Sequence, residues 1–270
     1  MPEVPEIASR CAEMNQALPG KYIRALEIKQ PKCLNIPVEL FQTRIAGAMI
    51  ETVSYHGKWL LICTSRGWIL LNLGMGGEIL LTNRQNLPSK FRAIIDFSDD
   101  SALVINFWWF GYLHYAEMDA LAQHEMTAKL GPNILDLSEE AFSERFRQQK
   151  GKVKAVLLDQ TRFAGIGNAY IHDILFLAHL HPLRPIASLS SEEIHQLYQA
   201  TRSGLLPALA KGGAFYETDL FGNKGRFLAE DVLIGYREGQ PCPQCQTPII
   251  KIKTGSTSSF ICPHCQSDTV

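Results

Sequence analysis

The chain has 270 residues, 46% of them apolar, and a net charge of −1, which allows one large domain or roughly two to three smaller ones. It contains no run of about 18 consecutive apolar residues, so no membrane partner is expected, and its first residues lack the basic-then-apolar pattern of a secretory signal. We therefore expect a cytoplasmic protein with sizeable buried cores. The near-neutral charge leaves a nucleic-acid partner open, because a local basic face matters more than the total.

The first half of the chain is predicted to be one helix followed by an antiparallel sandwich or barrel. From Val4 to Leu18 apolar residues repeat at helical spacing, and Pro19-Gly20 ends that helix. Short apolar segments separated by tight-turn signals then predict strands at 22–29, 58–65, 68–73, 92–97 and 102–110.

The pattern changes near Gly131, where helical spacing replaces the strands. Ser190 and Glu193 form a predicted capping box at the start of the last helix. The glycine-rich stretch 212–227 predicts a long loop, which in a compact domain is usually functional or disordered. The predicted helices cover 138–147, 153–158, 168–178 and 190–209.

Two CxxC pairs near the end of the chain predict a metal site. Sixteen residues separate Cys242-Pro-Gln-Cys245 from Cys262-Pro-His-Cys265, a spacing typical of tetrahedral zinc. The alternative, a pair of disulfides, is disfavoured in a cytosolic protein. Four thiolates leave no open position for water, so one zinc ion is expected to be structural, with a two-stranded hairpin between the pairs.

A turn with two glycines, AGIGNAY at 164–170, lies between two predicted helices. Gly165 and Gly167 permit unusual backbone geometry, so amides leading into a helix at Asn168 are able to face an anion. Lys150 and Lys154 lie nearby in sequence. Two interpretations remain open for this segment, a phosphate-binding element and an ordinary turn between helices.

The first six residues, MPEVPE, carry two prolines and two glutamates. One interpretation is that Pro5 starts a helix whose positive end the glutamates favour. The other is that the terminus itself is the reactive part of the molecule.

Taken together and in order, these segments resemble the formamidopyrimidine-DNA glycosylase / endonuclease VIII family. The resemblance runs nearly end to end, and its markers are MPEVPE, HGK at 56–58, NLGMGG at 72–77, LGPN at 130–133, LLDQTRFAGIGNAY at 157–170 and the CxxC pairs. It implies an α+β fold in three parts. These are a helix with a β-sandwich at 1–130, a helix–two-turns–helix domain at 131–235, and a zinc hairpin at 236–270.

The resemblance also implies a reaction at the amino terminus. Removal of Met1 leaves Pro2 as the terminal residue, whose free α-amine is partly neutral and nucleophilic near neutral pH. Its attack on the sugar C1′ of a damaged nucleotide gives an iminium, which permits β-elimination. Glu3 then matches the general acid/base, Glu6 an orienting carboxylate, and Lys58 a lysine that contacts the backbone and moves protons near the sugar.

The implied partner is double-stranded DNA with oxidised bases or abasic sites, bound by a monomer. The target base must leave the helix, and Met75 between two glycines matches the family's wedge that fills the gap. Without the resemblance, Met75 reads as a core methionine and Lys58 as a solvated turn residue. The resemblance implies phosphate contacts by Lys154 and Asn168. The cations Lys150 and Arg226 are predicted to bind DNA as well.

Three features of the sequence depart from the family pattern. Trp108 and Trp109 stand where the family carries arginines. Their rings are able to stack in the gap left by the flipped base, but hydrogen bonds from a guanidinium to the orphaned base are lost. Thr257 stands where the hairpin normally carries a phosphate-binding arginine, which puts δ-elimination in question. Asn72 replaces a histidine.

The sequence therefore predicts a bifunctional glycosylase and abasic-site lyase. Its rival is a non-catalytic damage sensor on the same scaffold, which the missing arginines favour and the set of Pro2, Glu3, Glu6 and Lys58 argues against. An RNA-associated zinc protein would explain the CxxC pairs but not MPEVPE.

Overall fold

The computed structural model describes residues 1–108 and 110–267. The chain divides into two compact units. The first comprises Met1–Lys129 and Lys211–Arg226, and the second comprises Leu130–Ala210 and Phe227–Val270. Each unit is therefore built from two separate stretches of the chain.

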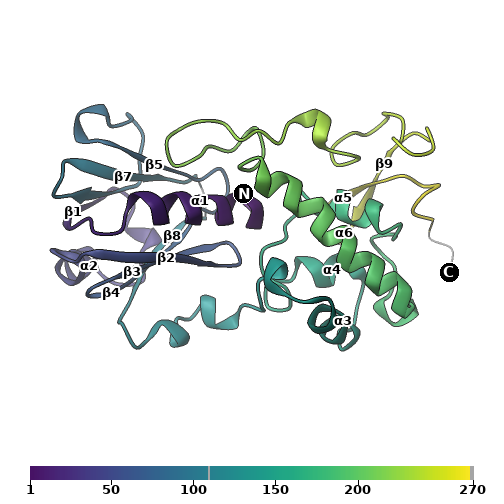
Figure 1. The fold of residues 1–270 in the computed structure, drawn as a ribbon, viewed down its shortest axis with the longest axis horizontal. Helices are drawn as coiled ribbons and strands as arrows, with labels where there is room; N and C mark the ends of the chain where they lie inside the picture. The colour runs from purple at the N-terminus through teal and green to yellow at the C-terminus, as the bar shows by residue number, and fades with distance from the viewer. Residues whose placement is uncertain (109, 268–270) are drawn as a thin grey trace. The chain divides into compact units, whose positions relative to one another are not determined.

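The first unit contains two antiparallel four-stranded sheets (Figure 1). One sheet has the order β1-β6-β7-β5 and the other the order β2-β3-β4-β8. The strands are β1 (Ile23–Ile28), β2 (Ile50–His56), β3 (Trp59–Thr64), β4 (Gly67–Asn72), β5 (Glu78–Asn83), β6 (Ala93–Phe97), β7 (Ser101–Asn106) and β8 (Tyr112–Ala116).

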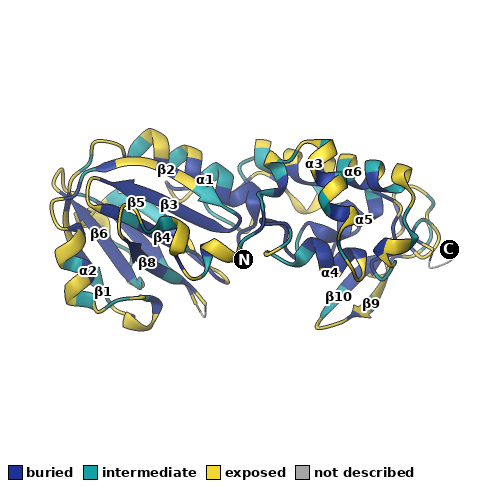
Figure 2. Cartoon of the chain, turned by 90° about the horizontal axis from the view of Figure 1, so that it is seen from below, coloured by how far each residue is buried: buried dark blue, intermediate teal, exposed yellow. Residues whose placement is uncertain are grey.

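One apolar core joins the sheets to helix α1 (Val4–Ala17). Alternate residues of a strand face the same side, and those facing inward are buried in both sheets (Figure 2). Helix α1 packs against β2 and β3 and contributes Ile7, Met14 and Leu18 to this core. The packing anchors the first turn of α1, and therefore the chain terminus, to the sandwich.

The predicted strands and the first helix are confirmed, with shifts at their ends. The predicted strand 102–110 ends at Asn106 in the structure. Trp108 and Phe110 lie in the loop that follows, and both are exposed. Strands β2, β5 and β8 and helix α2 (Val38–Ile45) lie outside the predicted ranges. Strands β2 and β5 and helix α2 each have only one buried side and mix polar with apolar residues, so their periodic signal is weak.

The second unit is mainly helical. Helix α5 packs against α4 and α6, and α6 also packs against α3. Gly204 allows the close approach of α6 to α5, because a Cβ there would lie 2.7 Å from Ile174 Cγ1. The helices are α3 (Glu139–Arg147), α4 (Val153–Leu158), α5 (Ile171–Leu177) and α6 (Ser191–Ala210).

One helix start differs from the prediction. Helix α5 begins at Ile171 with Tyr170 as its N-cap, so Asn168 lies in a turn before the helix. Gly165, with φ of +117°, makes the turn possible. The predicted helix start at Asn168 is therefore too early, and the amides of 168–170 lie in the turn that leads into the helix. The phosphate-binding interpretation of this segment stays a prediction.

Strands β9 (Ile250–Thr254) and β10 (Thr257–Ile261) form the predicted two-stranded hairpin. Asp173 in α5 fixes the chain leading towards the hairpin by accepting N–H bonds from Leu233, Ile234 and Gly235 at 2.8 to 3.0 Å. Within residues 1–108 and 110–267, no helix combines the length and the apolar character needed to cross a membrane.

Candidate active site and zinc hairpin

The acidic terminus forms the start of α1. Glu3 is the N-cap residue, and its backbone N–H donates to Glu6 Oε2 at 2.9 Å in a capping box. Pro5 lies in the first turn, where its missing N–H costs nothing. Pro2, Glu3 and Glu6 are buried, each glutamate being only 3% exposed. The helix-start interpretation is therefore correct, but burial of two carboxylates goes beyond what a helix start requires.

The segment 211–226 closes over Glu6. Ala214 N–H donates to Glu6 Oε1 at 3.0 Å, so both carboxylate oxygens of Glu6 accept backbone bonds. Gly213, with φ of +94°, makes this contact possible, because a Cβ there would lie 2.7 Å from Glu6 Cγ. The predicted glycine-rich loop thus positions the Glu6 carboxylate: Gly213 permits the close approach, and Ala214 N–H makes the hydrogen bond.

Lys58 lies in the turn between β2 and β3 and is 7% exposed. Gly57 precedes it with φ of +57°, as a tight hairpin turn requires. Burial lowers the pKa of Lys58, while the negative charges of Glu3 and Glu6 oppose that change. The four residues predicted to carry the chemistry are thus all buried in one unit, and the charges of three of them interact.

Asn72 connects the Lys58 turn to the Met75 loop. Its Nδ2 donates to the carbonyl of Lys58 at 3.1 Å, and its Oδ1 accepts from Gly74 N at 3.0 Å. Trp59 and Asn72 are paired across β3 and β4, which places Asn72 beside the turn. The residue that replaces the family's histidine therefore orders two predicted functional segments at once.

Met75 lies at an exposed loop tip and not in the core. It is 55% exposed, and the flanking Gly74 and Gly76 have φ of +57° and +64°. The Trp108 ring lies beside this tip, 3.5 Å from a Cβ built on Gly76. Trp108 and Phe110 are 67% and 63% exposed. Phe110 was not predicted as a site residue, although its place in an exposed aromatic run was a usable signal.

A groove adjoins this aromatic loop. It encloses about 870 Å³ and is lined by Trp108 and three cations, Lys29, Lys90 and Arg92. Lys29 Nζ lies 3.6 Å from the centre of the Phe91 ring, which fixes its position. Trp109, predicted as a DNA contact, lies outside the described residues.

Lys154 lies beneath the hairpin in the second unit and is 3% exposed. Its ammonium donates to Thr254 Oγ1 and Thr257 Oγ1 at 3.1 Å each, to Ser258 O at 2.7 Å and to Ser259 Oγ at 2.8 Å. Burial lowers its pKa to about 8. Thr257, which stands where the resemblance leads us to expect an arginine, therefore accepts a hydrogen bond from this lysine.

The remaining predicted DNA contacts are on or near the surface. Lys150 and Arg226 are exposed, and Asn168 is half-buried. The Asn168 side chain donates to the hydroxyl of Tyr236 at 3.4 Å, and that hydroxyl donates to the Asn168 carbonyl at 3.3 Å. Tyr236 is 62% exposed and was not predicted as a site residue, because a lone tyrosine in an irregular segment carries no pattern.

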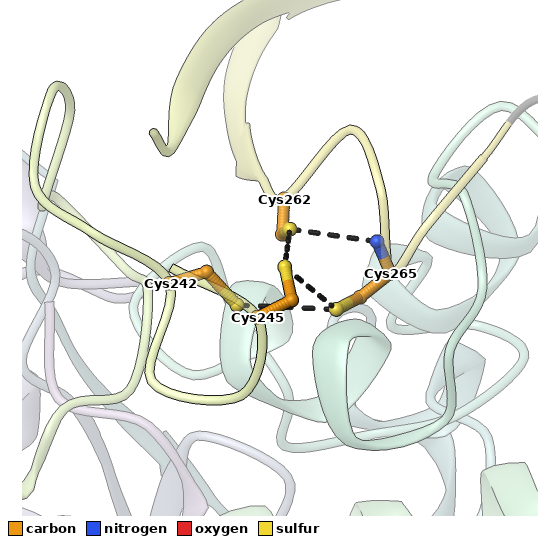
Figure 3. Close-up of side chains that lie close together, drawn as sticks. All are labelled: Cys242, Cys245, Cys262 and Cys265. Carbon is orange, nitrogen blue, oxygen red and sulfur yellow. Dashed lines mark hydrogen bonds between the residues drawn. The ribbon is translucent and has the colours of Figure 1, made fainter. Parts of the chain in front are cut away.

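The four cysteines of the two CxxC pairs form one cluster (Figure 3). Their sulfur atoms all lie within 4.8 Å of one another. The Sγ–Sγ distances are 3.9 Å for Cys242–Cys265, 3.4 Å for Cys245–Cys262 and 3.5 Å for Cys245–Cys265. A tetrahedral zinc with Zn–S bonds of about 2.3 Å requires separations of about 3.8 Å. The cluster therefore fits one structural zinc ion held by four thiolates.

Family comparisons cover the two units. Residues 1–108 match the formamidopyrimidine-DNA glycosylase N-terminal domain, and residues 130–219 match the formamidopyrimidine-DNA glycosylase H2TH domain. Residues 239–267 match the zinc finger found in FPG and IleRS. The third match agrees with the four-cysteine cluster, so the predicted structural zinc is confirmed.

Relatives with assigned names match over nearly the whole chain. The formamidopyrimidine-DNA glycosylases of Chloroflexus aurantiacus and Streptococcus pneumoniae are each 32% identical over 272 residues, which covers 98% of this chain and 98% and 99% of theirs. The structure of Lactococcus lactis Fpg bound to DNA with an abasic site has a TM-score of 0.90 at 26% identity and covers 98% of this chain. That of the wild-type Lactococcus enzyme with N7-benzyl-Fapy-dG DNA also has a TM-score of 0.90, at 27% identity over 99% of this chain.

The fold, the zinc cluster and the end-to-end similarity agree with the resemblance seen in the sequence. The α+β architecture with a helix–two-turns–helix region and a zinc hairpin is confirmed. This chain belongs to the formamidopyrimidine-DNA glycosylase family of base-excision repair enzymes.

Proposed function

We propose that this protein removes oxidised bases from double-stranded DNA and cleaves the strand by β-elimination, with Pro2 as nucleophile once Met1 is removed. The observation that carries the proposal is the burial of Glu3, Glu6 and Lys58 beside Pro2. A secondary α-amine titrates far below a lysine, so part of it is unprotonated at neutral pH. It attacks C1′ and the base leaves as the glycosidic bond breaks. The nitrogen then loses its proton, the C1′–O4′ bond breaks so that the sugar ring opens, O4′ takes a proton, and the nitrogen lone pair forms the C1′=N iminium.

Each polar neighbour has a distinct role in this chemistry. Glu3 exchanges protons with the sugar and the departing base as the general acid/base. Glu6 is a positioning residue, because both of its oxygens accept N–H bonds from the terminus and the 211–226 segment. Lys58 has its pKa lowered by burial, which makes its ammonium a better proton donor.

DNA recognition is proposed for residues of both units, most of them exposed, together with Trp109, which lies outside the described residues. Met75 and the rings of Trp108, Trp109 and Phe110 fill the gap left by the extruded base. Lys150, Asn168 and Arg226 contact phosphates. Lys154 acts through the hairpin that it orders, since its ammonium is bonded to hairpin oxygens. The cations of the groove beside Trp108 favour the DNA backbone, so affinity falls steeply with salt.

The rival function, damage sensing without catalysis, explains the exposed aromatic loop but not the terminus. Two buried carboxylates cost desolvation energy and repel phosphates, so a protein that only binds DNA gains nothing from them. The lesion class proposed is oxidised bases, and the Lactococcus complexes with Fapy-dG and abasic-site DNA support it. We place the protein in the bacterial cytosol as a monomer.

The proposal is tested by borohydride trapping on a duplex with one abasic site. Intact mass first establishes whether Met1 is absent. We expect a covalent adduct whose modified peptide contains Pro2, loss of that adduct in Pro2→Gly, and slower reaction in Glu3→Gln. Pro5→Gly is the matched control, since it makes the same change in the same stretch and should retain trapping. Absence of an adduct from Met1-free protein that still binds DNA would support the damage sensor.

A further inference from the structure

Glu217 is a largely buried carboxylate next to the chain terminus that the reaction proposed above does not use. Its side chain is 12% exposed, and its Oε1 lies 3.8 Å from the α-amine of Met1. Glu217 N donates to the Ala214 carbonyl at 2.9 Å, and Gly225 N donates to the Glu217 carbonyl at 3.1 Å. The same segment is bonded to Glu6 through Ala214. The position of Glu217 relative to Pro2 is therefore set by the fold of the first unit.

The Met1–Pro2 peptide bond shows where a substrate bonded to the Pro2 nitrogen would lie. A peptide C–N bond is planar with partial double-bond character, as is the C=N bond of an iminium. The carbonyl carbon of Met1 thus stands in for C1′, and Met1 Cα, the bulkier of its two substituents, stands in for C2′. The Met1 nitrogen stands in for a substituent of C2′. Glu217 Oε1 lies 3.8 Å from that nitrogen, so its carboxylate faces the region where a substituent of C2′ would lie in the adduct.

Resting on the proposed function, we propose that Glu217 is a further catalytic residue, the base that removes the C2′ proton of the Pro2 iminium during β-elimination. Glu217 Oε1 takes the proton, and the C2′–H electron pair forms a C1′–C2′ double bond while the iminium nitrogen regains its lone pair. The resulting enamine then expels the 3′ phosphate with the C3′–O bonding pair, and a C2′–C3′ double bond forms. Water later hydrolyses the iminium, and no oxidant or reductant is needed.

The charges around Glu217 suit this role. Burial raises the pKa of Glu217 to about 7 in the chain that carries Met1; the Met1 α-amine, Arg10 and Lys224 act to lower it, and Glu6 to raise it. A base with a pKa near the working pH combines a large unprotonated fraction with a strong pull on the proton. Glu6, by contrast, has both oxygens bound to backbone N–H groups, which leaves it poorly placed to accept a proton from carbon.

The inference is tested with Glu217→Gln in single-turnover reactions on an abasic-site duplex, with borohydride added at successive times. The reductant traps adducts on both intact and cleaved strands, which a denaturing gel separates by size. We expect trapping of the intact strand at the wild-type rate and strand cleavage slowed by about 100-fold. The intact-strand adduct should accumulate. The wild-type cleavage rate should rise with pH as Glu217 loses its proton, above the usual range of a glutamate because burial raises its pKa, and Glu217→Gln should lack that rise.

Glu13→Gln is the matched control. Glu13 Oε2 accepts from Leu220 N at 2.8 Å and so holds the same segment without approaching the terminus. Because glutamine keeps an acceptor for Leu220 N, Glu13→Ala is made beside it to break this bond; if loosening of the segment caused the defect, Glu13→Ala would show it too, and the inference would fail. Cleavage at the wild-type rate in Glu217→Gln, or a slower first trapping step, would also overturn it. Absence of any adduct in the wild-type protein would instead refute the proposed function, so the two failures are distinguishable.

Discussion

Two buried lysines, one in each unit, show how differently the protein surrounds the same charge. Lys58 is 7% exposed and has the carboxylates of Glu3 and Glu6 near it. Lys154 is 3% exposed, but its four hydrogen-bond acceptors are hydroxyl and carbonyl oxygens of the hairpin. Burial lowers both pKa values, and the nearby negative charges oppose the effect only at Lys58.

The different surroundings of Lys58 and Lys154 indicate different roles, one in catalysis and one in structure. Carboxylates beside an ammonium form a network that is able to exchange protons with a substrate. Neutral oxygens arranged around an ammonium satisfy its N–H donors and fix the turn that supplies them. We therefore assign Lys58 to the chemistry and Lys154 to the shape of the hairpin, and the following changes test that assignment.

The largest effect is expected from Cys262→Ser. Loss of one thiolate removes most of the zinc affinity, and apparent binding energies of about 10–16 kcal/mol support such small domains. Hydrogen exchange should become fast in 250–261, which includes the oxygens around Lys154, and stay slow in 59–72 around the Lys58 turn. Zinc content is measured in parallel. Protection of 250–261 in a zinc-free protein would show that Lys154 alone orders the hairpin.

Lys58→Met should give the next largest effect. Removing a proton donor beside the sugar should slow single-turnover cleavage by about 10²–10⁴-fold at saturating enzyme, with a smaller change in DNA affinity. Lys154→Met is the matched control and should show the reverse, weaker binding with a near-normal rate once bound. Equal loss of rate in both variants would remove the distinction between the two lysines.

The comparison also shows which parts of the site the sequence was able to predict. The four cysteines were predicted from their spacing. The zinc hairpin and the sandwich were predicted for the same reason, since both rest on short-range spacing. The roles of Pro2, Glu3, Glu6 and Lys58 came from the family resemblance, which the short stretches MPEVPE and HGK carry, and they stay predictions.

The contacts between distant segments were not predictable in this way. Glu217 reaches the terminus only because 211–226 folds back onto the first unit. Lys154 and Thr257 are 103 positions apart, and nothing in either segment indicates that they meet. A single residue in an irregular segment, such as Tyr236, carries no periodicity. Such sites depend on tertiary packing, which spacing does not encode.

A third test uses pH. The pKa of Lys154 falls from its ordinary 10.5 to about 8 on folding, so between these values the unfolded chain binds more protons than the folded one. The free energy of unfolding should therefore rise by about 3 kcal/mol in total between pH 8 and pH 10.5, with no contribution below pH 8. Urea unfolding of wild type and Lys154→Met at several pH values measures the difference, which cancels the titration of other groups. Parallel curves for the two proteins would contradict the buried state of this ammonium.

The smallest effect is expected at Asn72, which holds the Lys58 turn to the Met75 loop. Asn72→Ala removes the bonds to Lys58 O and Gly74 N and should cost about 2 kcal/mol of stability. Asn72→Asp keeps an acceptor for Gly74 N but places a carboxylate against the Lys58 carbonyl. If the asparagine matters chiefly for the lysine, both variants slow cleavage on a preformed abasic site, where no base needs to be extruded. If it matters chiefly for the loop, only Asn72→Ala is impaired, and the loss appears in release of a damaged base.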